Sequence, residues 1–278
     1  MSASLPAWSA RVASLARRNG VYEETIRCVP EETAIALSYD GSTHAVMMGT
    51  PHDLIDFAYG FSLTEGVIQR PEDIASIEIV PAGEGIDIQM RLAIEAAEAF
   101  GARRRSMAGP VGCGLCGIES IEQALRPPRL VPRRREALTP DLVTAALGSL
   151  VAHQPLHALT HAVHAAGYVE PRSGLTIVRE DVGRHNALDK LGGALLCAGQ
   201  ETAAGAVVVT SRVSVEMVQK TAAIGCPLLI AISAPTALAI RTANEAGIAL
   251  VAVARESEFE VFTRPELLHQ GSVAADVA

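Results

Sequence analysis

The feature that most constrains the fold is an alternation of short apolar runs and helical segments in the second half of the chain. Apolar runs and segments of helical periodicity follow one another at 174–178, 186–196, 205–209, 214–225, 227–232, 236–247 and 248–254. This rhythm is typical of helices packed on a parallel or mostly parallel sheet. It predicts an α/β domain over residues 137–278, with Thr139 and Pro140 at the start of the first helix.

A smaller, strand-rich domain is predicted over residues 21–105. Residues 32–48 have the pattern of a hairpin that turns at Asp40-Gly41. Thr50 and Pro51 are predicted to start a helix, with Thr50 as its N-cap. That helix is predicted to end at Gly66, and two further strands are predicted at 77–80 and 86–92. Residues 1–20 are predicted to be an N-terminal tail.

The composition narrows the class of protein. The chain has 278 residues, 49% of them hydrophobic and 19% charged, which is enough for a sizeable folded core. The net charge of −8 argues against nucleic acid or a membrane surface as a partner. The five cysteines suggest no disulfide framework, and the N-terminus does not resemble a secretory signal, so we expect a cytoplasmic protein.

Two of the cysteines lie in a glycine-rich stretch, VGCGLCG, within a loop-rich basic connector predicted over residues 106–136. Cys113 and Cys116 could bind zinc, form a redox disulfide, or carry a sulfur atom. A zinc site lacks a second pair at similar spacing, and a thioredoxin-like site would lie within a βαβ unit. Glycines and nearby arginines suit an accessible thiolate. The cysteine spacing alone supports a sulfur-carrier role, a redox role and a metal-binding role almost equally.

Polar residues gather where three predicted strands end and the next helices begin. In sheets of this kind ligands bind at the carboxyl ends of the strands. Helix N-termini favour anions there, and arginines suit phosphates. We therefore predict a shared pocket for a phosphorylated ligand, formed by six side chains: Arg184, His185, Ser211, Arg212, Ser233 and Thr236.

Structural roles compete for the same residues. Serine, threonine, asparagine and aspartate at helix starts are ordinary N-caps. Glu180 and Asp181 are predicted to take part in a structural ion pair with Arg184. His185 is at least as well suited to an exposed hydrogen-bonding role as to packing.

Together these segments resemble one family, the formate dehydrogenase accessory sulfurtransferases (the FdhD family). The resemblance spans about residues 32–268, and its most specific stretch is REDVGRHNALDK. The other matching stretches are DGSTHAVMMGTPHDLIDFAYGFSLTEGVI, CGLCG, VHAAG, TSRVSVEMVQK, ISAPTALAI and VFTRPELL. The resemblance implies a cytidine-deaminase-like C-terminal domain without its zinc, and a homodimer.

The resemblance also implies a function. A cysteine desulfurase would hand sulfur to Cys113 as a persulfide, with Cys116 as the companion catalytic thiol. The sulfur would then pass to the bis(molybdopterin guanine dinucleotide) molybdenum cofactor that the catalytic subunit of formate dehydrogenase needs. The resemblance assigns binding of this cofactor, including its guanine nucleotide, to a stretch near the C-terminus: Phe262, Thr263, Arg264, Pro265, Glu266 and Leu267.

Other points stay open at the level of sequence. The alternative function is a binding module that presents the cofactor, with structural thiols and no sulfur transfer. No tightly held metal of its own is expected. One departure from the family is His161-Ala162, which stands where two glycines are usual. The client enzyme, the desulfurase, the choice between molybdenum and tungsten, and the role of Cys116 are not determined.

Overall fold

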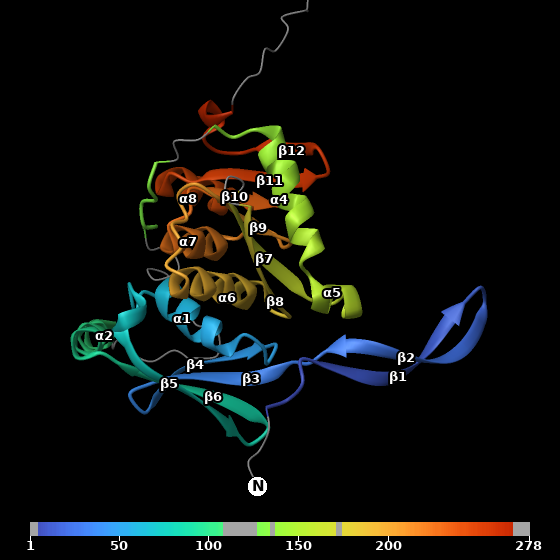
Figure 1. Cartoon of the computed structure of the whole chain (residues 1–278), viewed down its shortest axis with the longest axis horizontal. Helices are drawn as coiled ribbons and strands as arrows, with labels where there is room; N and C mark the ends of the chain where they lie inside the picture. The colour runs from blue at the N-terminus through green and yellow to red at the C-terminus, as the bar shows by residue number, and fades with distance from the viewer. Residues whose placement is uncertain (1–4, 108–126, 134–136, 171–173, 269–278) are drawn as a thin grey trace, which may run out of the picture.

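The computed structural model describes residues 5–107, 127–133, 137–170 and 174–268. These residues form sheets of two, four and six strands. Figure 1 shows the four-stranded sheet below the six-stranded sheet, with the two-stranded ribbon projecting to one side. Among the described residues, no helix is both long and apolar enough to cross a membrane.

The N-terminal domain is a four-stranded sheet covered on one face by α1 (Leu54–Thr64). Its order is β4-β3-β6-β5, with bounds Ser42–Gly49, Thr33–Tyr39, Gly85–Leu92 and Ile74–Ala82. The predicted hairpin is confirmed, because Asp40 and Gly41 have φ angles of 49° and 81° and join β3 to β4. Ile35 and Ile88 on the inner face pack with Phe57 of α1 in one apolar core.

The N-terminal tail predicted over residues 1–20 is wrong for most of that range. Residues Ser9–Arg18 form β1, which pairs antiparallel with β2 (Val21–Pro30) along its whole length. Asn19 and Gly20, with φ angles of 50° and 85°, make the two-residue turn. Asn-Gly is the strongest local signal for such a turn, and it was present in the sequence. Neither strand alternates polar and apolar residues clearly, which is why the pattern predicted no strand.

The start of the connector also differs from the prediction. Residues Ile94–Met107 form helix α2, which enters the range predicted to be loop-rich. Phe100 of α2 is buried against the N-terminal core, so packing rather than periodicity holds this helix in place. The predicted helical segment near residues 118–125 lies outside the described residues.

The C-terminal domain is a six-stranded sheet with order β12-β11-β10-β9-β7-β8. The bounds are Glu258–Val261, Ala249–Arg255, Leu228–Ala231, Ala206–Val209, His164–Glu170 and Leu175–Asp181. Only β9, β10 and β11 pair in parallel; β7 and β12 run against their neighbours. The sheet is therefore mixed, and the expected mostly parallel pairing holds only in its centre. The likeness to cytidine deaminases stays a prediction.

Helices cover both faces of this sheet. One face packs against α6 (Arg184–Cys197), α7 (Val215–Ile224) and α8 (Ala237–Ala246). The other face packs against α4 (Pro140–Ala152), which leads into the short α5 (Pro155–Thr160). The helix start predicted at Thr139-Pro140 is confirmed, and Thr139 caps α4 by accepting a hydrogen bond from the Leu142 amide at 3.2 Å. Two short 3-10 helices, η1 (Pro71–Asp73) and η2 (Pro265–Leu267), complete the described structure.

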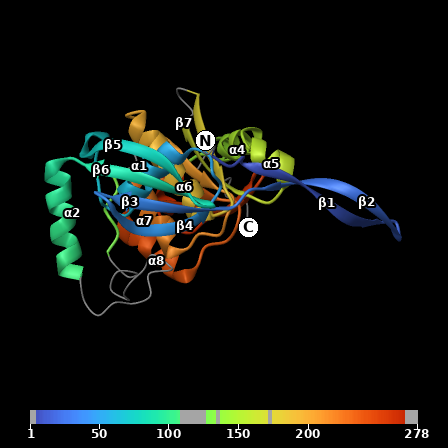
Figure 2. The same cartoon turned by 90° about the horizontal axis from the view of Figure 1, so that it is seen from below.

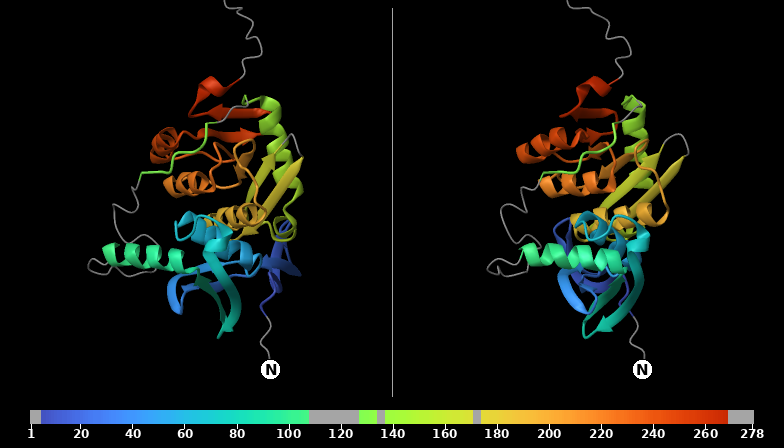
Figure 3. Two further views of the ribbon diagram at one scale, coloured as in Figure 1. Left: turned by 60° about the vertical axis from the view of Figure 1, so that its left-hand side comes forward. Right: turned by 90° about the vertical axis from the view of Figure 1, so that its left-hand side faces the viewer.

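The two domains meet where α1 crosses α6 (Figure 3). A Cβ atom added to Gly60 would lie 1.6 Å from the Asp189 carbonyl oxygen, and one added to Gly193 would lie 1.8 Å from the Asp56 carbonyl oxygen. Only glycine lets the backbones approach this closely. Thr50 is not the N-cap of α1, contrary to the prediction, since Asp53 precedes the first turn. Thr50 instead bonds the other domain, as described below.

Candidate functional site

The carboxyl ends of β8, β9 and β10 lie along one edge of the six-stranded sheet. The loops after these strands lead into α6, α7 and α8. The Val213 amide donates to the Ala234 carbonyl, and the Thr236 amide donates to the Val213 carbonyl, at 3.3 and 3.0 Å. These bonds join the loops after β9 and β10, and the strand order places the loop after β8 at the same edge. The segments that carry the six predicted residues therefore lie along one edge of the sheet: Arg184, His185, Ser211, Arg212, Ser233 and Thr236.

Two buried polar atoms at this edge are left without a protein partner. Gly183 and Ser214 precede α6 and α7, and neither supplies a side-chain cap. Within the described part of the chain, Arg184 Nε and Ser214 Oγ are buried and have no hydrogen-bond partner. Such groups are costly unless a ligand or water satisfies them. Together with two uncapped helix N-termini, they suit an anion such as a phosphate.

His185 joins the two helices at this edge. Its Nε2 lies 2.8 Å from Oε2 of Glu216 in the first turn of α7. The hydrogen bond from His185 lowers the pKa of the Glu216 carboxyl, although burial opposes the shift. This agrees with the hydrogen-bonding role predicted for His185, which is partly exposed. Glu216 is a member of the edge that the sequence analysis missed, although SVEMVQK places it one turn into a predicted helix.

The other predicted residues have more ordinary local roles. Thr236 caps α8 by accepting a hydrogen bond from the Ala239 amide at 3.2 Å. Ser211 is buried and donates to the Arg212 carbonyl at 3.0 Å. Arg212 is exposed, and the Ser233 carbonyl accepts from Val253 at 3.3 Å. Of this group, Arg212 offers the most accessible charge.

The last two residues of β8, Glu180 and Asp181, make contacts that stabilise the fold. Asp181 pairs with Lys190 at 2.7 Å and accepts from the Thr50 amide at 2.9 Å. Lys190 in turn donates to the Thr50 carbonyl at 2.9 Å. The predicted structural ion pair thus exists for Asp181, but its partner is Lys190 and not Arg184. Glu180 instead accepts the amides of Leu156 and His157 at 2.8 and 2.7 Å.

The stretch near the C-terminus lies at the other end of β11. Thr263 Oγ1 accepts from the Leu250 amide at 2.8 Å and donates to the Ile248 carbonyl at 2.7 Å, both at the start of that strand. The Ser233 carbonyl bonds the Val253 amide nearer its end, three residues of strand beyond Leu250, which is roughly 10 Å. Arg264 pairs with Glu266 at 3.0 Å. Thr263 therefore lies at the start of β11, and its cofactor-binding role stays a prediction.

Cys113 and Cys116 lie outside the described residues. The described chain ends before them with α2, at Met107, and resumes at Pro127. Pro127 and Arg129 border a cavity of about 210 Å³ beside the ends of α1 and α7. Among the residues that the structure describes, no three potential metal ligands come together.

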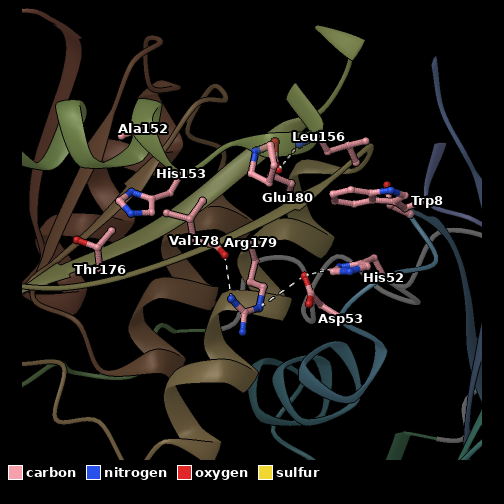
Figure 4. Close-up of a pocket in the computed structure, with 12 residues that line it drawn as sticks. Trp8, His52, Asp53, Ala152, His153, Leu156, Thr176, Val178, Arg179 and Glu180 are labelled. Carbon is pink, nitrogen blue, oxygen red and sulfur yellow. Dashed lines mark hydrogen bonds and ion pairs between the residues drawn. The ribbon is translucent and has the colours of Figure 1, made fainter. Parts of the chain in front are cut away.

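A second cavity, of about 480 Å³, lies between the N-terminal ribbon, α1, α5 and β8 (Figure 4). Trp8 stacks on His52 at its rim, with ring centroids 4.9 Å apart. Arg179 lies 2.7 Å from Asp56 and 3.7 Å from Asp53, so the charges here largely satisfy one another. Sequence analysis missed this cavity because Trp8 fell within the predicted tail.

The chain is similar to known proteins over most of its length. Residues 30–269 match the FdhD/NarQ family. A protein of Agrobacterium fabrum named sulfur carrier protein FdhD is 58% identical over 92% of this chain and 94% of its own length. A protein of the same name from Cupriavidus necator is 49% identical over 88% of this chain and 85% of its own length.

A solved structure agrees with the fold. A crystal structure described as a formate dehydrogenase accessory protein from Desulfotalea psychrophila has a TM-score of 0.74 and 26% identity. The match covers 95% of this chain and all of that one. Sequence and fold agree over nearly the same span of residues. The chain belongs to the FdhD/NarQ family.

Proposed function

We propose that this protein is a sulfur carrier for formate dehydrogenase, and that it carries sulfur as a persulfide on Cys113. The observation that supports this most is the near full-length similarity to proteins named sulfur carrier protein FdhD, at 58% identity in Agrobacterium fabrum. The CGLCG stretch supplies the two thiols that such a role requires. The cytoplasm, where thiols stay reduced, is the proposed place of action.

Two of the three described cysteines make poor alternatives to Cys113. Cys226 is completely buried. Cys197 is exposed, but burial of its thiol, followed by the charge of Asp56, raises its pKa and lowers its thiolate fraction. Cys28 lies partly exposed at the root of the ribbon. The thiolate is the nucleophile in sulfur exchange, so the environments of Cys226 and Cys197 do not suit that role.

Loading is a thiol exchange that needs no outside oxidant or reductant. The Cys113 thiolate attacks the terminal sulfur of the persulfide on a cysteine desulfurase. The sulfur–sulfur bond of the donor breaks, the donor cysteine leaves as a thiolate, and Cys113 keeps the transferred sulfur as its own persulfide. Cys116 is the companion thiol in this proposal.

The proposed acceptor is the bis(molybdopterin guanine dinucleotide) cofactor, with its phosphates at the carboxyl edge. The unpartnered Arg184 Nε and Ser214 Oγ fit an anion there, as do the uncapped starts of α6 and α7. Phe262–Leu267 remains a predicted cofactor-binding stretch. Thr263 of this stretch lies at the start of β11, so a contact that it makes with the cofactor would lie away from the carboxyl edge.

A desulfurase-coupled mass measurement tests the carrier role. Incubation with a cysteine desulfurase and cysteine is expected to add one sulfur to the protein and to the Cys197→Ala control, but none to Cys113→Ala. If Cys113→Ala gains the same adduct, the assignment is wrong. If Cys113→Ala also activates formate dehydrogenase fully, the protein is a binding module for the cofactor instead.

A nucleotide titration tests the acceptor site separately. GDP carries the guanine and phosphates of the proposed ligand. Arg184→Gln and Ser214→Ala are each expected to weaken GDP binding about tenfold, because each removes a charged or buried hydrogen bond. The exposed Arg255→Gln on β11 serves as the control. Unchanged GDP affinity in both variants would remove the nucleotide from this edge.

A further inference from the structure

The outer edge of β8 carries backbone groups that face away from the sheet. In the described part of the chain, β8 ends the six-stranded sheet and pairs only with β7. Ala165 of β7 faces away from β8, because its carbonyl accepts from the Thr210 amide at 3.1 Å. In an antiparallel pair the opposite residue, Glu180, then also faces away from its partner strand. By alternation along the strand, the N–H and C=O groups of Thr176 and Val178 face the same way.

Two further contacts agree with this direction. The Val178 carbonyl accepts from Arg179 Nη1 at 2.9 Å. The Val182 amide, just beyond the strand, donates to Thr50 Oγ1 at 3.2 Å. Neither donor nor acceptor on the far side belongs to β7. Thr50 covers the edge beyond the strand, so the open part is Thr176–Glu180, about 14 Å long at ~3.4 Å per residue.

The cavity of about 480 Å³ lies against this open edge (Figure 4). Four residues of β8 line it: Thr176, Val178, Arg179 and Glu180. The end of α4 and the start of α5 form another wall, and the root of the β1–β2 ribbon lies beside α5 (Figure 2). This volume is in the usual range of ligand pockets. A cavity beside outward-facing N–H and C=O groups suits an extended peptide, which can pair with β8 as an added strand.

The lining also indicates which side chain such a peptide carries. Two carboxylates, those of Asp53 and Glu180, line the cavity. Arg179 lines it too, but its charge is matched by Asp56, whose carboxylate lies 2.7 Å away. A second cation beside the two carboxylates is therefore favoured. Trp8 adds an indole ring, the aromatic group that attracts cations most strongly. The lining thus suits an arginine or lysine side chain.

We propose that the outer edge of β8 binds an extended basic segment of a partner protein. The segment adds a strand beside β8 and places an arginine or lysine side chain in the cavity near Trp8. Hydrogen bonds to the β8 backbone supply affinity, and the carboxylates of Asp53 and Glu180 select a basic side chain. This inference concerns a docking site and does not depend on the sulfur-carrier role.

Trp8 makes this site directly measurable, because it is the only tryptophan in the chain. The probe is the peptide acetyl-Thr-Val-Arg-Val-Thr-amide, added to the full chain while the tryptophan emission is recorded. A saturable change in emission is expected. The same peptide with glutamate in place of arginine is expected to bind at least tenfold more weakly, because it places a third carboxylate in the cavity.

Backbone methylation of the peptide tests the strand pairing itself. Only every second amide of an added strand faces β8. Two peptides N-methylated at alternate amides keep the same side chains but lose different donors. One is expected to bind like the unmodified peptide and the other at least tenfold more weakly, because it loses its hydrogen bonds to β8.

Variants of the protein test the same contacts from the other side. Thr176→Pro removes an outward amide and leaves the bonds to β7 in place, so it should weaken peptide binding about tenfold. Asp53→Asn should weaken it about threefold or more by removing a charge, and asparagine tolerates the φ of 53° at this position. It also covers the case in which Thr176→Pro disturbs the strand. Glu260→Gln on β12, at the opposite edge of the sheet, is the control with the same loss of charge.

Several results would overturn the proposal. These are no saturable change in Trp8 emission, equal binding of the arginine and glutamate peptides, and equal binding of the two methylated peptides. A peptide that binds only by dissociating a dimer, as seen by sedimentation, would assign the edge to a second copy of the chain. Binding that becomes tenfold tighter when residues 1–4 are deleted would assign it to the chain's own N-terminus.

Discussion

At the scale of single residues, both lysines of the chain are buried at the junction of the two domains. Lys190 and Lys220 are the only lysines in the sequence. Lys190 pairs with Asp181, and Lys220 lies 2.8 Å from Asp189 and 3.0 Å from Thr64. Burial alone would lower the pKa of Lys220, but Asp189 and Glu65 more than offset it and raise that pKa. The specific motif REDVGRHNALDK is therefore largely a structural motif.

Removing Lys190 is expected to leave a buried charge uncompensated. Lys190 and Asp181 are both completely buried. Lys190→Met should lower the free energy of unfolding by about 3–5 kcal/mol, because the Asp181 carboxylate then lacks its cation. Urea unfolding at neutral pH measures this. The exposed Arg255→Met should change stability by less than about 0.5 kcal/mol. A loss below about 1 kcal/mol in Lys190→Met would mean that the backbone amides and the Asn186 side chain are enough to stabilise the Asp181 carboxylate.

His164 is expected to couple nucleotide binding to proton uptake. Burial, followed by the charges of Arg184 and His185, lowers the pKa of His164, while Asp181 opposes the shift. A histidine with a lowered pKa binds fewer protons in the folded state than in the unfolded one. The free protein should therefore lose stability as the pH falls below about 6.5. A bound phosphate favours the charged imidazole, so GDP affinity should rise over the same pH range.

Calorimetry of GDP binding in buffers of different ionisation enthalpy measures this proton uptake. It should be present near pH 6 and absent near pH 8. His164→Gln should abolish it, whereas His185→Gln serves as the comparison at the neighbouring histidine. Equal proton uptake in the wild type and His164→Gln would assign the effect to another group.

At the scale of elements, the crossing of α1 and α6 depends on two glycines. Gly60→Ala or Gly193→Ala would push a methyl group into the opposite helix backbone, at 1.6 and 1.8 Å from a carbonyl oxygen. We expect each change to cost about 3 kcal/mol or more, because two backbones must separate. Thermal unfolding measures the loss. Gly148→Ala on α4 is the matched control: its Cβ would meet nothing within 4 Å, so it should stabilise by up to about 1 kcal/mol.

His161 shows a related constraint at the end of α5. It closes the helix with a φ of 56°, a left-handed conformation that glycine adopts more easily. The family resemblance placed glycines at this point, and the observed backbone gives the physical reason for that preference. In this chain the exposed His161 adopts the left-handed conformation instead of a glycine.

At the scale of the whole molecule, the two domains are expected to unfold together. Their contact includes the buried pair Lys190–Asp181 and the close crossing of α1 with α6. Neither domain could expose these groups without a large penalty. Calorimetry should therefore show one transition whose van't Hoff and calorimetric enthalpies agree. Two resolved transitions would show that the domains fold independently.

Features that depend on local chemistry could be predicted from the amino-acid sequence. Asp40-Gly41 predicted a turn, Thr139 and Pro140 predicted a helix start, and the alternation after residue 174 predicted helices on a sheet. The same alternation correctly brought Arg184, Ser211 and Thr236 to one edge of the sheet. These patterns predict structure correctly because each depends on the backbone geometry of a few consecutive residues.

Other features became visible only in the folded protein. Residues 9–18, predicted to be part of a tail, form strand β1. Thr50 and Asp181 join the two domains through a hydrogen bond. Thr263, within Phe262–Leu267, lies at the start of β11, away from the carboxyl edge. Each outcome depends on contacts between residues far apart in the chain. The sequence around Asp181 does not distinguish an aspartate that faces a ligand from one that pairs with a buried lysine. The choice depends on burial, because a charge removed from water is stable only beside its partner.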